Sequence, residues 1–217
     1  MQEKCNEFWK WFTENEDRLE MAITEYIEII TSSNQMEDYL PMMDKLTNRL
    51  KRVDKRFMFE FIAQKGKDGR YTMFISPQGH APSFENTFNL VGLKPNLKHF
   101  HIHALKQPEE KEILRGLTLA CEGEHIKIGD IHFNYTENED GRLDLVFYVK
   151  NFKGNLEFVG GQLLHILDKV IGEYYVATKI GDIDIKKRSM SDRVGNLRLP
   201  QLRDVMEQHL GHAIQSN

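Results

Sequence analysis

Lys67-Asp68-Gly69-Arg70 and Glu139-Asp140-Gly141-Arg142 are two similar turn sequences that lie about 72 residues apart in a chain of 217 residues. Asp-Gly pairs favour tight β-hairpins, because glycine adopts a positive φ without steric cost. Each turn lies between two strand-like runs, and each second run leads into a helix-like segment and a further strand. The sequence therefore predicts an internal repeat with the order strand, strand, helix, strand.

The first predicted repeat covers residues 56–106. Phe57, Phe59 and Phe61 alternate with other residues, and this period of two is typical of a strand. The hairpin partner follows the turn, and Lys94-Pro95-Asn96 ends the helix-like segment. The predicted elements are strands at 57–62 and 71–76, a helix at 83–93 and a strand at 99–105.

The second predicted repeat covers residues 126–186. Its helix is indicated by a stripe of apolar residues at helical spacing, and this stripe follows the second hairpin. The predicted elements are strands at 131–136 and 143–150, a helix at 156–170 and closing strands at 174–179 and 183–185. Residues 107–125, between the repeats, show no pattern that predicts their structure.

Residues 1–55 predict an N-terminal helical hairpin. Apolar residues recur at steps of three and four over 9–30 and again over 36–53, the pattern of two amphipathic helices. The polar cluster at 31–34 separates the two stripes. Pro41 belongs in the first turn of the second helix or marks its start, because proline has no N–H to donate within a helix.

Together these elements predict an α+β fold in a single domain that spans residues 1–217. A strand-strand-helix-strand unit has too few faces to bury a core alone. We therefore expect the two repeats to join in one twisted antiparallel sheet with helices on one side. The N-terminal hairpin would cap this sheet, and residues 187–217 would form a C-terminal tail with a short helix at 199–210.

Composition and charge narrow the functional classes. The net charge of −4, with mixed signs, argues against nucleic-acid binding, which depends on clustered Lys and Arg. The densest basic run, Lys186-Lys187-Arg188, leads into a region that Asp192 and Asp204 interrupt. No apolar run approaches the roughly 20 residues of a membrane span. Because Cys5 and Cys121 lie far apart and the N-terminus is polar, we expect a cytoplasmic protein with free thiols.

Two short stretches carry a family resemblance. The opening Phe8-Trp9-Lys10-Trp11-Phe12 with Asn15-Glu16, and the closing Gly172-Glu173-Tyr174 with Thr178-Lys179-Ile180-Gly181, resemble a family of uncharacterised bacterial proteins that begin and end in this way. The resemblance implies a compact bacterial α+β protein. It brings no catalytic residues with it.

The stretch from His99 to Ala104 suggests a metal site. Strand alternation places His99, His101 and His103 on one face, with neighbouring side chains about 6.6–7 Å apart. Two imidazoles at this spacing can share one divalent metal such as zinc, with a further ligand from an adjacent strand. The candidates for that ligand are Cys121, Glu122, Glu124, His125 and His132, and we assign His132 with the three strand histidines. Two alternatives stay open, a solvated strand face and a pH-responsive surface of mutually repelling imidazoles.

Phe8, Trp9, Trp11 and Phe12 are the candidate partner-binding residues. Four large rings within five helix positions cannot all point to one side of a helix. Either both sides pack inside the protein, or one side binds a protein partner or a second copy of the chain.

The sequence favours a non-enzymatic cytoplasmic protein-interaction module, for example a regulator or a toxin-neutralising protein. No nucleophile–base pair, phosphate loop or strong metal motif accompanies the scaffold, so no catalytic residue is assigned. The alternative is a metal-dependent hydrolase that uses the His99, His101 and His103 strand. A nucleic-acid-binding sheet is a third class, which the missing basic stripe disfavours.

Overall fold

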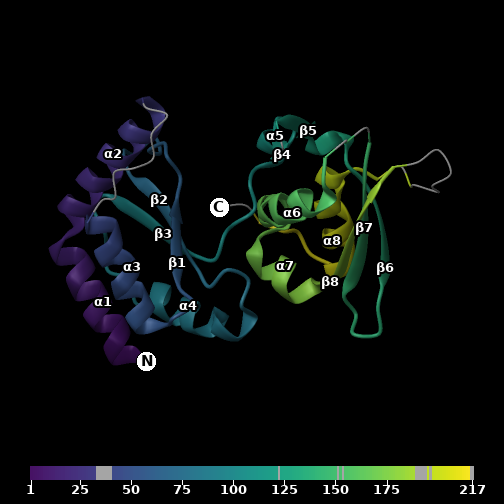
Figure 1. Cartoon of the computed structure of the whole chain (residues 1–217). Coiled ribbons are helices and arrows are strands. Elements are labelled where there is room, and N and C mark those ends of the chain that lie inside the picture. The colour runs from purple at the N-terminus through teal and green to yellow at the C-terminus, as the bar shows by residue number, and fades with distance from the viewer. Residues whose placement is uncertain are drawn as a thin grey trace. The chain divides into compact units, whose positions relative to one another are not determined.

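The computed structural model describes residues 1–32, 41–121, 123–150, 152, 154–188, 195 and 197–215. These residues form a mixture of α-helices and β-strands, which confirms the predicted α+β composition. The chain divides into two compact units, residues 1–105 and 106–217. Each unit has a hydrophobic core of its own, and Figure 1 shows the first in purple to teal and the second in teal to yellow.

Three helices begin the first unit: α1 (Gln2–Glu14), α2 (Glu16–Ser32) and α3 (Pro41–Val53). The helix expected over 9–30 is therefore two helices that meet at Asn15, whose side-chain amide donates to the carbonyl of Trp11 at 2.8 Å. Pro41 is the first residue of α3, as expected, because a missing N–H costs nothing there. The apolar positions expected at Met36 and Tyr39 lie outside the described residues.

The strands of the first unit are β1 (Met58–Phe61), β2 (Tyr71–Ser76) and β3 (Phe100–Ala104), in the order β1-β2-β3. The β1–β2 pair is antiparallel, and its connection contains Gly69 with a φ of 81°. β2 and β3 are parallel. The helix α4 (Phe84–Gly92), preceded by a 3₁₀ turn at Ala81–Ser83, lies in the crossover between them.

One face of this sheet forms the first core. Met73, Ile75 and Ile102 are fully buried on it, and the same cluster contains residues from α1, α2, α3 and α4. Phe12 of α1 meets Phe100 of β3 with their ring centroids 5.4 Å apart. Burying each such side chain contributes roughly 1.5–3 kcal/mol to the stability of the fold. The apolar faces of the helices therefore keep the helices packed on the sheet.

Among its described residues, the second unit contains two sheets. β4 (Thr118–Cys121) and β5 (Glu124–Lys127) form an antiparallel pair. β6 (His132–Glu137), β7 (Leu143–Val149) and β8 (Ile180–Lys187) form a sheet in which β6–β7 is antiparallel and β7–β8 is parallel. Its helices are α5 (Lys111–Leu114), α6 (Leu156–Ile171), α7 (Glu173–Lys179) and α8 (Leu202–Leu210).

Alternate residues of β7, together with Phe133 of β6, bury their side chains beneath α6 and α8. Phe133, Leu145 and Phe147 are at most 1 % exposed, and they belong to one cluster with Leu167 of α6 and Met206 of α8. The predicted C-terminal helix at 199–210 is confirmed as a 3₁₀ turn at Leu199–Gln201 followed by α8.

The expected single antiparallel sheet is wrong. Among the described residues the strands form three separate sheets, and the last strand of each three-stranded sheet is parallel to its neighbour. A helix that crosses over the sheet returns the chain to the end at which the previous strand began, so the next strand runs in the same direction. The crossovers through α4 and α6 therefore dictate parallel pairing.

The closing strand expected at 174–179 is also wrong, because these residues form the helix α7. Gly172 has a φ of 86° just before it. The buried side chain of Glu173 accepts a hydrogen bond from the backbone N–H of Lys106 at 3.0 Å, and the N–H of Glu173 donates to the carbonyl of Lys106 at 3.0 Å. These tertiary contacts fix the start of α7 and override the local strand preference of the sequence.

Within the described ranges, no helix combines the length and the apolar character that crossing a bilayer requires.

Candidate functional site

His101 and His103 of β3, and His99 just before the strand, alternate with buried residues, as expected. His99, His101 and His103 are partly exposed, whereas Phe100 and Ile102 between them are at most 2 % exposed. The alternation predicted from the sequence is therefore present. It places imidazoles on the face opposite the first core.

Each of these histidines has contacts of its own. His99 Nε2 lies 2.7 Å from Asp17 Oδ1, and His101 Nε2 lies 2.6 Å from Asp68 Oδ2. The ring of His103 packs against Phe74 with 5.9 Å between the ring centroids. In the parts of the chain that are described, no three His, Cys, Asp or Glu side chains form a group that could hold a metal ion.

His132 belongs to the second unit, where Arg188 Nη1 lies 3.4 Å from both ring nitrogens. Burial and the positive charge of Arg188 lower the pKa of His132 below its ordinary value. His125 lies exposed on β5. Of the other candidate ligands, Glu122 and the side chains of Cys121 and Glu124 lie outside the described residues.

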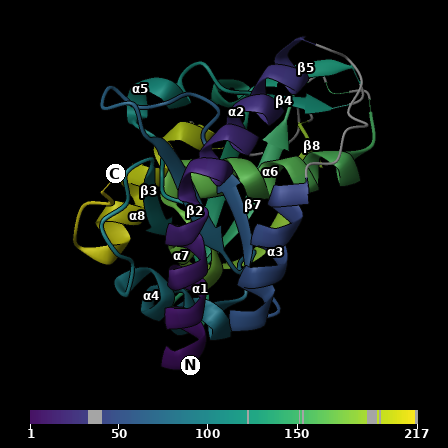
Figure 2. The same cartoon turned by 90° about the vertical axis from the view of Figure 1, so that its left-hand side faces the viewer.

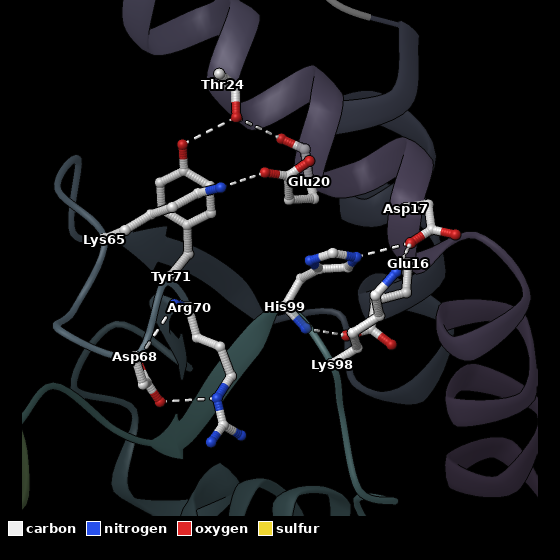
Figure 3. Close-up of polar contacts among 10 residues, drawn as sticks. All are labelled: Glu16, Asp17, Glu20, Thr24, Lys65, Asp68, Arg70, Tyr71, Lys98 and His99. Atoms are coloured by element: carbon white, nitrogen blue, oxygen red, sulfur yellow. Dashed lines mark hydrogen bonds and ion pairs between the residues drawn. The ribbon is translucent and has the colours of Figure 1, made fainter.

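The polar residues around His99 attach the start of α2 to the sheet (Figure 3). Glu16 Oε1 accepts from the backbone N–H of His99 at 2.7 Å. Hydrogen bonds from His99 and Lys98 lower the pKa of the Asp17 carboxyl. One turn further along α2, the Lys65–Glu20 ion pair and a 2.9 Å contact between Thr24 and Tyr71 continue the attachment. This cluster connects a helix to a sheet, and its groups are already occupied with one another.

Three of the four candidate partner-binding aromatics lie in the first core, which corrects their assignment to a binding surface. Phe8, Trp9 and Phe12 are 2 %, 4 % and 0 % exposed. The indole N–H of Trp9 donates to the carbonyl of Leu90 at 2.7 Å. These three rings share one face of α1 with Cys5, and that face packs inside the unit. Only Trp11 of this group stays half-buried at the surface.

Trp11 lines a groove between α1 and α3, two helices that lie side by side in Figures 1 and 2. The groove encloses about 380 Å³, and we call it the α1–α3 groove. A neighbouring hollow of about 260 Å³ shares Arg49 and Arg52 with it and adds Lys4, Glu7 and Phe8. The residues that line the α1–α3 groove are Trp11, Asn15, Lys45, Asn48, Arg49 and Arg52.

Positive charge dominates this surface. Lys45, Arg49 and Arg52 lie at positions i, i+4 and i+7 of α3, so they share one helix face. Within the described residues none of the three forms an ion pair, and Glu7 is the one carboxylate among the residues that line the two hollows. Arg49 Cζ lies 5.4 Å from the centre of the Trp11 ring, a cation–π contact that holds the guanidinium over the groove.

The local sequence explains why these cations face outward. Leu46, Leu50 and Val53 are at most 4 % exposed and bury one face of α3 in the core. Each cation comes directly before one of these core residues, so the three cations lie about 100° around the helix, on one flank of α3. This stripe was not among the predicted site residues, although the basic residues between Lys45 and Arg56 indicate it. Its partner Trp11 comes from another helix, which no local pattern could have paired with it.

The groove is chemically suited to an anion on a protein. Guanidinium groups bind carboxylates through two parallel hydrogen bonds, and Arg and Trp side chains are enriched among the residues that dominate protein interfaces. Asn15 and Asn48 supply neutral polar groups beside the charges.

Comparison with known proteins adds no function to this site. No model of a known protein family matches the chain, and no curated protein matches it. The residues of the groove therefore supply the functional evidence.

Proposed function

We propose that the protein is a non-enzymatic interaction module that binds an acidic segment of a partner protein in the α1–α3 groove. The observation that carries the proposal is the row of Lys45, Arg49 and Arg52 beside Trp11, with no ion pair to any described residue. These cations keep their capacity for charged hydrogen bonds. A carboxylate-rich segment would satisfy them.

The choice of a protein partner over a nucleic acid follows from charge and size. The chain carries a net charge of −4, whereas nucleic-acid binding relies on a broad cationic surface along the phosphate backbone. The groove offers a few cations next to an indole and two amides. This composition suits a short peptide segment.

As expected from the sequence, the proposed module acts in the cytoplasm. A regulator and a toxin-neutralising protein are examples of such interaction modules. The buried free thiol of Cys5 supports a reducing compartment. The alternative is a metal-dependent hydrolase built on His99, His101, His103 and His132. Among the described residues, no group of side chains converges as a set of metal ligands that would support it.

We also infer that the two units derive from one duplicated strand-strand-helix-strand segment. The support is topological. The sheets β1-β2-β3 and β6-β7-β8 each begin with an antiparallel hairpin and end with a parallel strand after a helix.

Fluorescence anisotropy with a labelled peptide of alternating Glu and Ala tests the binding proposal. We expect the full-length chain to bind this peptide and the Arg49→Glu/Arg52→Glu variant to bind it at least 10-fold more weakly, a loss of about 1.4 kcal/mol. The matched control is Lys51→Glu/Lys55→Glu, which makes the same change of charge at exposed sites outside the groove. The control variant should bind within twofold of the wild type.

Equal weakening in both double variants would show that total charge, and not the groove, attracts the peptide. A labelled single-stranded oligonucleotide serves as the second probe. Tighter binding of the oligonucleotide than of the peptide would overturn the choice of a protein partner, and no binding of the peptide at millimolar concentration would overturn the proposal itself.

A further inference from the structure

A second cavity lies on the other flank of α3, between this helix and α2. It encloses about 300 Å³, and we call it the α2–α3 cavity. Its apolar lining comes from Met21 and Ala22 of α2 and from Pro41 and Met42 of α3. Arg18, Glu25 and Lys45 form the rest of the lining.

Lys45 lines both this cavity and the α1–α3 groove, so the two hollows adjoin on the surface of α3. Pro41, Lys45, Asn48 and Arg52 lie at positions i, i+4, i+7 and i+11, which form one ridge on the helix. At 1.5 Å per residue this ridge is about 16 Å long. Apolar residues line a cavity at its first turn, and arginines line the groove toward its last turn.

We propose that the partner segment is an amphipathic α-helix that lies along α3, inserts one apolar side chain into the α2–α3 cavity and places its carboxylates on Arg49 and Arg52. This inference rests on the proposed function and adds the form of the ligand to it.

The apolar anchor follows from the exposure of the cavity walls. Met21 is 58 % exposed, an unusual state for a large apolar side chain, whereas Ala22 and Met42 are buried at 8 % and 9 %. The cavity therefore has a buried apolar floor beside a flexible apolar wall. Methionine adapts its shape to a bound side chain, which makes it common at peptide-binding surfaces.

The helical form follows from the spacing. Met42 and Arg49 are seven residues apart on α3, a distance of about 10.5 Å along the helix axis. A ligand helix presents residues i and i+7 on one face at the same distance. One apolar residue and an acidic residue two turns away would therefore meet both hollows together, as in other complexes in which a helix docks through anchors at this spacing.

Selection from a displayed library of random 16-residue peptides tests the inference, with counter-selection against the Arg49→Glu/Arg52→Glu variant. We expect the enriched sequences to carry acidic residues and one Leu, Met, Phe or Ile six to eight positions away from them. Enriched sequences that are acidic but lack the apolar residue at this spacing would overturn the helix inference and leave the proposed function standing. Sequences that bind the double variant equally well, or a failure to enrich any sequence, would overturn both.

A pair of methionine variants gives a second measurement. With an enriched peptide, Met21→Ser should weaken binding about 10-fold, because it removes an apolar wall of the cavity. Met58→Ser is the matched control, since Met58 is 38 % exposed on β1 and lines neither hollow. Replacing the apolar residue of the peptide with Ser should cause a similar loss. Unchanged binding after Met21→Ser would contradict the placement of the anchor, whatever the fate of the arginine variants.

Discussion

Gly181, the second residue of β8, has no room for a side chain. A Cβ at this position would overlap Asp144 Oδ1 and lie 2.6 Å from Asn138 Nδ2. Those atoms cannot easily retreat, because Asp144 Oδ1 accepts hydrogen bonds from Asn138 Nδ2 at 2.9 Å and from the N–H of Asp182 at 2.8 Å. Gly181→Ala should therefore lower the free energy of unfolding by about 1–3 kcal/mol, as measured by urea denaturation.

Gly161 provides the matched control. It lies inside α6, and no atom lies within 4 Å of an added Cβ. Gly161→Ala should raise the free energy of unfolding by about 0.5–1 kcal/mol, because alanine is the better helix former. A similar loss of stability in both variants would contradict the steric explanation for Gly181.

Asp68 gives a second prediction for a single residue. The hydrogen bond from His101, followed by that from the backbone N–H of Arg70, lowers the pKa of this carboxyl from 3.8 to about 2. A lowered carboxyl pKa stabilises the fold above pH 3.8, and the contribution is lost as the pH falls from there toward 2. His101→Asn should raise the pKa of Asp68 toward 3.8 in a carboxyl NMR titration. His99→Asn should instead raise the pKa of Asp17 and leave that of Asp68 in place.

The residues of the proposed binding groove were predictable only in part. Trp11 was among the residues that the sequence singled out, and the stripe of Lys45, Arg49 and Arg52 could have been read from helical spacing. The burial of Phe8, Trp9 and Phe12 could not, because it depends on which elements cover their face of α1. That coverage involves Leu90 and Phe100, which are far away in the sequence.

At the scale of elements, one buried arginine connects α8 to the end of α6. Arg203 is 2 % exposed. Its Nε donates to the carbonyl of Val170 at 2.6 Å, and its Nη2 donates to the carbonyls of Glu109 at 2.6 Å and Lys169 at 3.3 Å. The guanidinium thereby satisfies carbonyls at the C-terminus of α6 that have no partner within that helix.

Removal of this arginine should destabilise the second unit. Arg203→Met keeps much of the side-chain volume but leaves buried carbonyls without donors, and the expected loss in the free energy of unfolding is about 3 kcal/mol. Arg203→Lys keeps the charge but cannot reproduce the forked geometry. Thermal denaturation should rank the wild type above the lysine variant and the lysine variant above the methionine variant. A methionine variant as stable as the wild type would contradict this role.

The sequence predicted individual elements where the signal is local. The strand expected at 71–76 and the helix expected at 156–170 agree with β2 and α6 within one residue at each end, since period and turn chemistry lie within each segment. The error at 174–179 arose because contacts with Lys106 decide the structure of α7. The parallel pairing of β3 and β8 also depends on contacts across the crossovers, which no local pattern contains.

At the scale of the whole molecule, the two hydrophobic cores have no residue in common. The sequence predicts a single domain over residues 1–217. This prediction holds if the two cores unfold together, and it fails if each core unfolds independently of the other. We expect Phe147→Leu, a mild change in the core of the second unit, to speed amide hydrogen exchange in β6 and β7 while exchange in β1 and β2 stays unchanged. Phe12→Leu should have the reverse effect.

Hydrogen exchange followed by mass spectrometry makes this measurement. Joint loss of protection in both units, in either variant, would show one cooperative folding unit and support the single domain expected from the sequence. The expectation of one sheet failed at this scale, because it assumed that each repeat has too few faces to bury a core alone. The helices α1 to α4 supply the first unit with the faces it needs.

The parallel last strand of each unit also affects the chain while a ribosome is still making it. A hairpin such as β1–β2 can pair as soon as its turn emerges, but β3 can join β2 only after residues 77–99 have been added. At roughly 5–20 residues per second, β2 waits for about 1–5 s with one edge unpaired. For that time the nascent polypeptide exposes the unpaired backbone N–H and C=O groups along one edge of β2, and a chaperone that shields strand edges would find its substrate there.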